Sequence, residues 1–213
     1  MTKQNIILDY LKELFPDASC ELNFSTDFQL LVAVILSAQC TDKRVNIVTP
    51  ILFEKYPDAN AMQDAKQEDV ENIIRSCGFY REKAKHIISA SKDICEKFGG
   101  KLPRDRDDMQ TLAGVGRKTA NVICSNVYDD NVIAVDTHVL RVSNRLGLAN
   151  TSNPNICETN LEKLFKKQLK DLHHRLVLFG RYYCTARKPK CESCKLKNIC
   201  IYYKKNIKGW LCI

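Results

Sequence analysis

Apolar side chains recur at helical spacing along most of the chain, and no segment shows convincing apolar–polar alternation of the kind expected of a half-buried β-strand. The first apolar stripe, which ends before Pro16, consists of Ile6, Ile7, Tyr10, Leu11 and Leu14. Glycine accounts for only 8 of the 213 residues, which suits a helical bundle better than a turn-rich β fold. The sequence therefore predicts an all-α protein.

Capping and helix-breaking residues set the expected limits of the later helices. Residues 25–27 offer N-caps to a strongly apolar helix, and Thr41 starts another helix that ends before Pro57. The residues expected to face inward from that second helix are Val45, Val48, Ile51 and Leu52. Further helices are expected at 70–77, with Gly78 as its C-cap, and at 81–98, 106–112, 118–127, 137–146, 154–169 and 171–183.

Gly114 and Gly116 lie one residue apart between two of these expected helices. A hairpin of this form leaves backbone N–H groups free at the start of its second helix, where they and the helix dipole suit a phosphate oxygen. A side chain at either glycine would hinder close backbone approach. An ordinary tight turn is the alternative for the glycines alone, but the full pattern GVGRKTA favours a helix-hairpin-helix that holds a DNA backbone.

Two residues near the hairpin are candidates for chemistry. Lys118 lies in the first helical turn, where the dipole disfavours a cation, so its place is unfavourable for stability but suits a nucleophilic amine. A phosphate contact is the other interpretation of Lys118. Asp136 follows an apolar run and precedes a helix, so its simplest role is an N-cap. A capping aspartate is held rigidly, as a positioned base must be, and the two roles are compatible.

Four cysteines with six, two and five residues between them lie near the C-terminus: Cys184, Cys191, Cys194 and Cys200. Such a group indicates a metal site, and its local chemistry leaves both zinc and an iron–sulfur cluster open. The spacing differs from the paired C-x2-C of zinc ribbons, which favours iron–sulfur. The loop between the first two cysteines is basic, and we expect its Arg187 and Lys190 to contact phosphates.

Charge is divided unevenly along the chain. The formal net charge is +8, but residues 163–213 have a net charge of +12 and residues 1–162 a net charge of −4. The basic part suggests a polyanionic partner, most commonly nucleic acid, although a solvated lysine-rich surface is the alternative.

Neither an export signal nor a membrane span is recognisable in the sequence. The longest apolar run has seven residues, where a membrane helix needs roughly 18. Eleven cysteines without an export signal indicate reduced thiols. We therefore expect a cytoplasmic protein with no membrane contact.

The segments LSAQCTD, LAGVGRKTANV, IAVDTHVLRVSNRLGL and GRYYCTARKPKCESC, together with the cysteine spacing, resemble bacterial endonuclease III from Leu8 to about Tyr203. That family comprises DNA glycosylases with abasic-site lyase activity, which remove oxidised pyrimidines. The resemblance implies an all-α, two-lobed helix-hairpin-helix DNA glycosylase fold. Residues 20–131 would form a six-helix barrel that includes the helix-hairpin-helix at about 106–127. Residues 1–19 and 132–213 would form an iron–sulfur cluster domain.

The resemblance also implies residue roles. Lys118 matches the nucleophile and Asp136 the catalytic carboxylate, while the four cysteines match the ligands of a structural [4Fe–4S] cluster. Gln39 and Phe79 match positions that fill the gap left by a flipped nucleotide, and His138 is expected to contact the strand. Many bacterial members have leucine where this chain has Phe79, so its substrate preference could shift.

The expected partner is double-stranded DNA that contains oxidised pyrimidines or abasic sites, bound by a monomer in a prokaryotic cytoplasm at the nucleoid. Three alternatives remain open. An adenine-mismatch glycosylase usually lacks lysine at the position of Lys118 and carries a further C-terminal domain. A DNA-binding module without catalysis would not need Asp136 near a phosphate. A zinc-stabilised interaction protein would be colourless, whereas a [4Fe–4S] protein would be yellow-brown.

Overall fold

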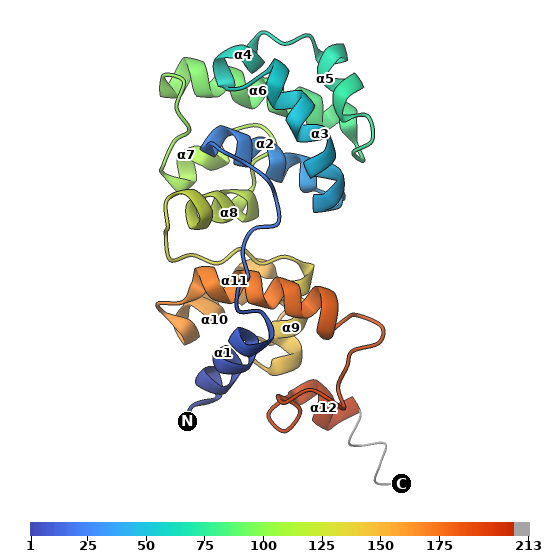
Figure 1. Ribbon diagram of the computed structural model, residues 1–213. Helices are drawn as coiled ribbons and strands as arrows, with labels where there is room; N and C mark the ends of the chain where they lie inside the picture. Colours follow the sequence, from blue (N-terminus) through green and yellow to red (C-terminus); the bar gives the residue numbers. More distant parts are fainter. Residues whose placement is uncertain (207–213) are drawn as a thin grey trace. The chain divides into compact units, whose positions relative to one another are not determined.

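The computed structural model describes residues 1–206, and this part of the chain is helical with no β-strand (Figure 1). The chain divides into two compact units, which we call the central unit, Cys20–Tyr128, and the terminal unit, Met1–Ser19 with Asp129–Ile213. The boundary expected after Asn131 lies close to this division. The expected cluster domain extends to residue 213, so its last seven residues, 207–213, lie outside the described ones.

The central unit is built around one apolar helix. Its helices are α2 (Asp27–Ser37), α3 (Asp42–Lys55), α4 (Ala59–Gln63), α5 (Gln67–Ile74), α6 (Tyr80–Phe98), α7 (Arg106–Gln110) and α8 (Arg117–Val127). Residues 30–36 of α2 are all buried, because α3, α6 and α8 pack against this helix. The side chains of Thr26 and Thr41 cap α2 and α3 by accepting hydrogen bonds from the backbone N–H groups of Gln29 and Arg44.

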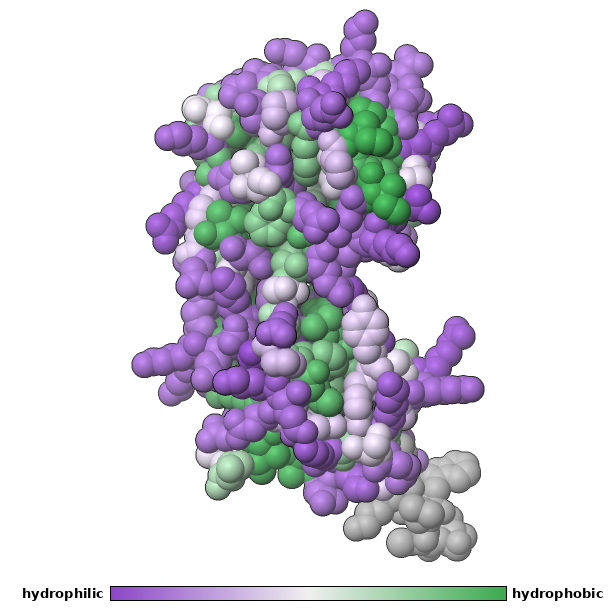
Figure 2. Space-filling model, in the orientation of Figure 1, coloured by the Kyte–Doolittle hydropathy of each residue, from purple (hydrophilic) through white to green (hydrophobic). Residues whose placement is uncertain are grey.

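The terminal unit brings the N-terminal helix against the last third of the chain. It contains α1 (Lys3–Leu14), α9 (Thr137–Leu146), α10 (Pro154–Phe165), α11 (Leu169–Leu178), the π-helix η1 (Phe179–Tyr183) and α12 (Ile201–Asn206). Ile7 and Leu11 of α1 are fully buried in a core with Leu172 and Leu176 of α11 and with Phe179. Hydrophilic residues cover most of the molecular face in Figure 2, as expected for helices that bury one side.

The structure corrects several expected helix limits. The helix expected at 154–169 ends at Phe165, because Lys166 takes a left-handed backbone with φ 42°. The helix expected at 171–183 is divided into α11 and the π-helix. Gly78 does not cap α5, which already ends at Ile74. Ile51 was expected to face inward but is 58% exposed.

Candidate DNA-binding elements and cluster centre

The two hairpin glycines occupy different environments in the central unit. Gly114 has φ 77°, and a Cβ added there would lie 3.0 Å from Cβ of His86 on α6. Both the backbone and the packing therefore require glycine at this position. Gly116 is the N-cap of α8 with φ −94°, and a Cβ there would meet nothing within 4 Å. The protein itself does not crowd Gly116, which leaves room for the close backbone approach expected at this glycine.

The N-cap residue of α8, Gly116, has no side chain that could cap the N–H groups, and the first turn of the helix holds no acidic residue. Ala120, Ile123 and Cys124 are the residues by which this helix packs into the core, and Lys118 is exposed to solvent. A helix N-terminus with an exposed amine can bind a phosphate or present a nucleophile.

Asp136 lies in the terminal unit at the N-cap of α9. Its Oδ1 accepts a hydrogen bond of 2.8 Å from the N–H of Val139, so the predicted capping role is confirmed. Asp136 is half-buried, and the three residues before it, 133–135, are buried. His138 follows on the same helix, with Nδ1 3.2 Å from Nη2 of Arg141. The start of α9 thus holds a capping carboxylate and, two residues further on, an imidazole anchored to Arg141.

Gln39 and Phe79 both have left-handed backbones, with φ 52° and 56°. Such conformations are uncommon outside glycine and cost of order 1–3 kcal/mol each. Both side chains are exposed, Phe79 by 65%. Exposed residues in strained backbone at the ends of well-packed helices are typical of binding loops.

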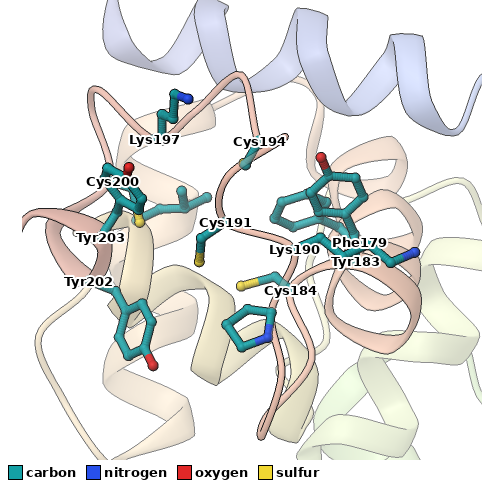
Figure 3. Close-up of a pocket in the computed structure, with 12 residues that line it drawn as sticks. Phe179, Tyr183, Cys184, Lys190, Cys191, Cys194, Lys197, Cys200, Tyr202 and Tyr203 are labelled. Atoms are coloured by element: carbon teal, nitrogen blue, oxygen red, sulfur yellow. The ribbon is translucent and has the colours of Figure 1, made fainter. Parts of the chain in front are cut away.

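The four cysteines line one pocket in the terminal unit, together with Leu146, Phe179, Tyr183, Pro189, Tyr202 and Tyr203 among others (Figure 3). Within residues 1–206, no three His, Cys, Asp or Glu side chains gather closely enough to hold a single metal ion. A [4Fe–4S] cluster takes one thiolate on each of its four irons. The donor set of four cysteines that line one pocket therefore fits such a cluster.

Two arginines of α9 hold the loop that begins at Cys184. Arg141 Nη2 donates to the carbonyl of Gly180 at 2.7 Å, and its guanidinium also contacts the carbonyl of Cys184. Arg145 donates to the carbonyls of Thr185 at 2.7 Å and of residue 186 at 2.9 Å. Its Nη1 also lies 3.4 Å from the Cys184 sulfur. The helix that begins at the Asp136 cap is thus bonded to the cluster loop.

Sequence reasoning did not identify Arg141 and Arg145, because their acceptors are backbone carbonyls about 40 residues away along the chain. The sequence shows only that the two arginines are four residues apart and so share one helix face. Arg187 and Lys190 are exposed, and the backbone N–H of Lys190 donates to the carbonyl of Tyr183 at 3.1 Å. The basic loop is therefore presented to solvent from an anchored base.

Comparison with known proteins identifies both parts of this arrangement. Residues 32–167 match the family described as HhH-GPD superfamily base excision DNA repair protein. Residues 184–200 match the iron–sulfur binding domain of endonuclease III. The chain is 47% identical to endonuclease III of Bacillus subtilis (strain 168) over 195 residues, covering 91% of this chain and 89% of that protein.

Two solved structures are similar over nearly the whole chain. A non-covalent endonuclease III–DNA complex has a TM-score of 0.91 at 46% identity, covering 98% of this chain and 99% of that one. A trapped endonuclease III–DNA covalent intermediate has a TM-score of 0.90 at 46% identity, covering 96% and 98%.

The fold and the cysteine site define a helix-hairpin-helix DNA glycosylase of base excision repair. Within that superfamily, the chain belongs to the endonuclease III family. It is a DNA glycosylase with abasic-site lyase activity, it binds DNA, and Cys184, Cys191, Cys194 and Cys200 lie in its [4Fe–4S] binding segment. The predicted all-α glycosylase fold and the predicted cofactor are confirmed. Within the described residues, no helix combines the length and apolarity needed to cross a membrane.

Proposed function

We propose that this enzyme removes oxidised pyrimidines from duplex DNA and nicks the resulting abasic site through a Schiff base on Lys118. The observation that carries the proposal is the exposed Lys118 in the first turn of α8, in a chain 46% identical to an endonuclease III trapped covalently on DNA. An exposed amine in the first turn of a helix that binds phosphate lies where the sugar of a held strand is within reach.

In the proposed reaction, the Lys118 amine attacks C1′ as the bond from C1′ to the damaged base breaks. Asp136 accepts the proton that the amine loses, or balances positive charge on the sugar, and its hydrogen bond to Val139 keeps it oriented. The sugar ring opens to a Schiff base. Loss of a C2′ proton then expels the 3′ phosphate by β-elimination, which nicks the strand, and hydrolysis frees Lys118.

Other residues hold the DNA in this proposal. Backbone N–H groups at Gly114 and Gly116 bind a phosphate, and the open space at Gly116 lets the strand approach. Gln39 and Phe79 fill the gap left by the flipped nucleotide, and His138 contacts the strand. The four cysteines hold the cluster, which stiffens the basic loop so that Arg187 and Lys190 contact further phosphates.

The units carry separate tasks in this scheme. Residues 20–131 act as the six-helix barrel with the hairpin, and residues 1–19 with 132–213 act as the cluster domain. We further propose a monomer that works in the cytoplasm at the nucleoid, since its bacterial relatives are repair enzymes and all of these elements belong to one chain.

Base release and nicking on defined duplexes test the substrate assignment. A duplex with one thymine glycol should lose the base and be nicked, whereas a duplex with adenine opposite guanine should remain intact. Asp136→Asn should slow both steps by roughly 10²–10⁴-fold, as loss of a positioned base does. Release of adenine from the mismatch, with no action on thymine glycol, would instead identify an adenine-mismatch glycosylase.

A further inference from the structure

Lys83 is a buried lysine that the proposed reaction does not use. It lies on α6 in the central unit and is only 5% exposed. Its Nζ donates hydrogen bonds of 2.8 Å to the carbonyl of Leu36 and 2.6 Å to that of Ala38. These carbonyls belong to the C-terminal end of α2, where no helical partner remains for them. The side chain therefore anchors the loop that follows α2.

The same residue is tied to a second loop through its backbone. The N–H of Lys83 donates to the carbonyl of Phe79 at 3.1 Å, which is the first hydrogen bond of α6. Phe79 and Gln39 are the strained, exposed residues of the two loops. The loops touch, since a Cβ added to Gly78 would lie 3.3 Å from the carbonyl oxygen of Gln39. Lys83 thus connects the backbone of one wedge residue with the loop of the other.

Burial lowers the pKa of Lys83, and interactions with Cys40 and Cys77 oppose this effect. The anchoring does not depend on the protonation state, because a neutral amine still has two N–H donors for the two carbonyls. Loss of the amine would leave two carbonyls without their buried donor at the point where Gln39 takes its strained backbone.

We propose that Lys83 is a positioning residue for base extrusion, which holds Gln39 and Phe79 as one rigid pair at the surface of the central unit. The inference rests on the proposed function, in which these two side chains fill the gap in the opened duplex. Lys83 touches neither the nucleotide nor the reacting atoms. Its effect should therefore appear only where a duplex has to be opened.

The test compares Lys83→Met with Lys85→Met, a change of an exposed lysine on the same helix. Excision from a thymine glycol duplex should fall about tenfold in Lys83→Met, because a small displacement of positioning groups has effects of at least this size. Nicking of a single-stranded abasic oligonucleotide, which needs no extrusion, should stay within about twofold. Visible cluster absorbance and thermal unfolding show that the variant is folded and loaded. An equal loss on both substrates, or no loss on the duplex, would overturn the proposal.

A double-mutant cycle separates positioning from general damage. In a background with Gln39→Ala and Phe79→Ala, Lys83→Met should have no further effect on duplex excision, because the groups it positions are gone. Additive losses would contradict the inference.

Fluorescence of 2-aminopurine beside an abasic-site analogue reports unstacking without any excision. The protein concentration needed for half of the fluorescence rise should be about tenfold higher for Lys83→Met than for the wild type. An unchanged rise would refute positioning by Lys83. Absence of excision by the wild-type enzyme would instead refute the substrate assignment alone.

Discussion

The hairpin glycines show how one residue type serves two purposes within three positions. Gly114 is required by the folded protein, because its φ is 77° and His86 packs against it. Gly116 has an ordinary φ and open space around its Cα, so packing does not require glycine there; the N-cap position, which prefers glycine over alanine, and the approach of a ligand both suit it. Folding and binding constraints are therefore separable at this site.

We expect Gly114→Ala to lower the free energy of unfolding by about 1–3 kcal/mol, through backbone strain and the contact with His86. Gly116→Ala should cost less stability, at most about 1 kcal/mol through the poorer N-cap, and should weaken DNA binding, since the new methyl group occupies the approach to the α8 N–H groups. Urea unfolding and binding to a duplex with an abasic-site analogue measure the two effects. The reverse assignment, with Gly116→Ala the unstable variant, would contradict this division of roles between the two glycines.

A buried histidine makes stability depend on pH. Burial, together with His173 and Lys170, lowers the pKa of His174 from 6.5 to about 4. The unfolded chain therefore binds a proton between these values while the folded chain does not. The resulting stability is fully present above pH 6.5 and is lost as the pH falls toward 4.

The unfolding free energy of the wild type should fall by roughly 2–3 kcal/mol over this range relative to His174→Gln, which does not titrate there. Denaturant unfolding of both proteins at several pH values gives the slope of unfolding free energy against pH for each protein. Because both proteins carry the same cluster, acid damage to the cluster cancels in the comparison. Parallel curves would show that His174 does not titrate as the burial indicates.

At the scale of elements, α9 connects the Asp136 cap with the cluster loop. Asp136 caps its N-terminus, and Arg141 and Arg145 reach from its later turns to the carbonyls that surround Cys184. Gly180 allows this packing, because a Cβ there would lie 2.8 Å from Cβ of His138. The Arg145 guanidinium is also 4.3 Å from the centre of the Tyr202 ring. Loss of Arg145 should therefore loosen the loop on which the cluster depends.

Arg145→Lys keeps the charge but loses the planar set of donors, so at most part of its bonds to Thr185, Ala186 and the Cys184 sulfur can remain. The cluster should bleach several-fold faster during incubation in air, measured by its visible absorbance, because hydrogen bonds to charged groups contribute about 1.5–3 kcal/mol each. Lys188→Met, in the same exposed loop, is the control. Equal bleaching rates in Arg145→Lys and the wild type would show that the arginine does not support the cluster.

At the scale of the whole molecule, the cluster loop presents part of the positive charge of the basic C-terminal region to solvent. Arg187 and Lys190 are exposed beside the pocket lined by the cysteines, within the part of the chain that carries a net charge of +12. Contacts with phosphates are independent of base identity and release counterions.

Arg187→Ala and Lys190→Ala should each weaken binding to all DNA sequences alike and reduce the slope of log K against log salt by about 1. Lys101→Ala, an exposed lysine in the part of the chain with net negative charge, should change neither quantity. Binding measured over a range of salt concentrations distinguishes these cases. Unchanged slopes for both loop variants would refute their role as phosphate contacts.

Much of this organisation was predictable because local rules determine it. Periodicity and caps placed most long helices, including both limits of the helix from Thr137 to Leu146, and motif spacing identified the cysteine quartet. The five-residue α4 was too short to produce a period. The left-handed backbone of Lys166 and the bonds of Lys83 depend on tertiary contacts that no local pattern encodes.

A covalent bond between Lys118 and DNA is the step on which the proposed function most depends. Borohydride trapping tests it on a duplex with one thymine glycol and on an abasic-site duplex, with the wild type and Lys118→Ala. We predict a covalent adduct on both duplexes that is absent in the variant. An adduct that persists in Lys118→Ala, or none from cluster-loaded wild-type protein, would contradict the assignment of Lys118 as the nucleophile.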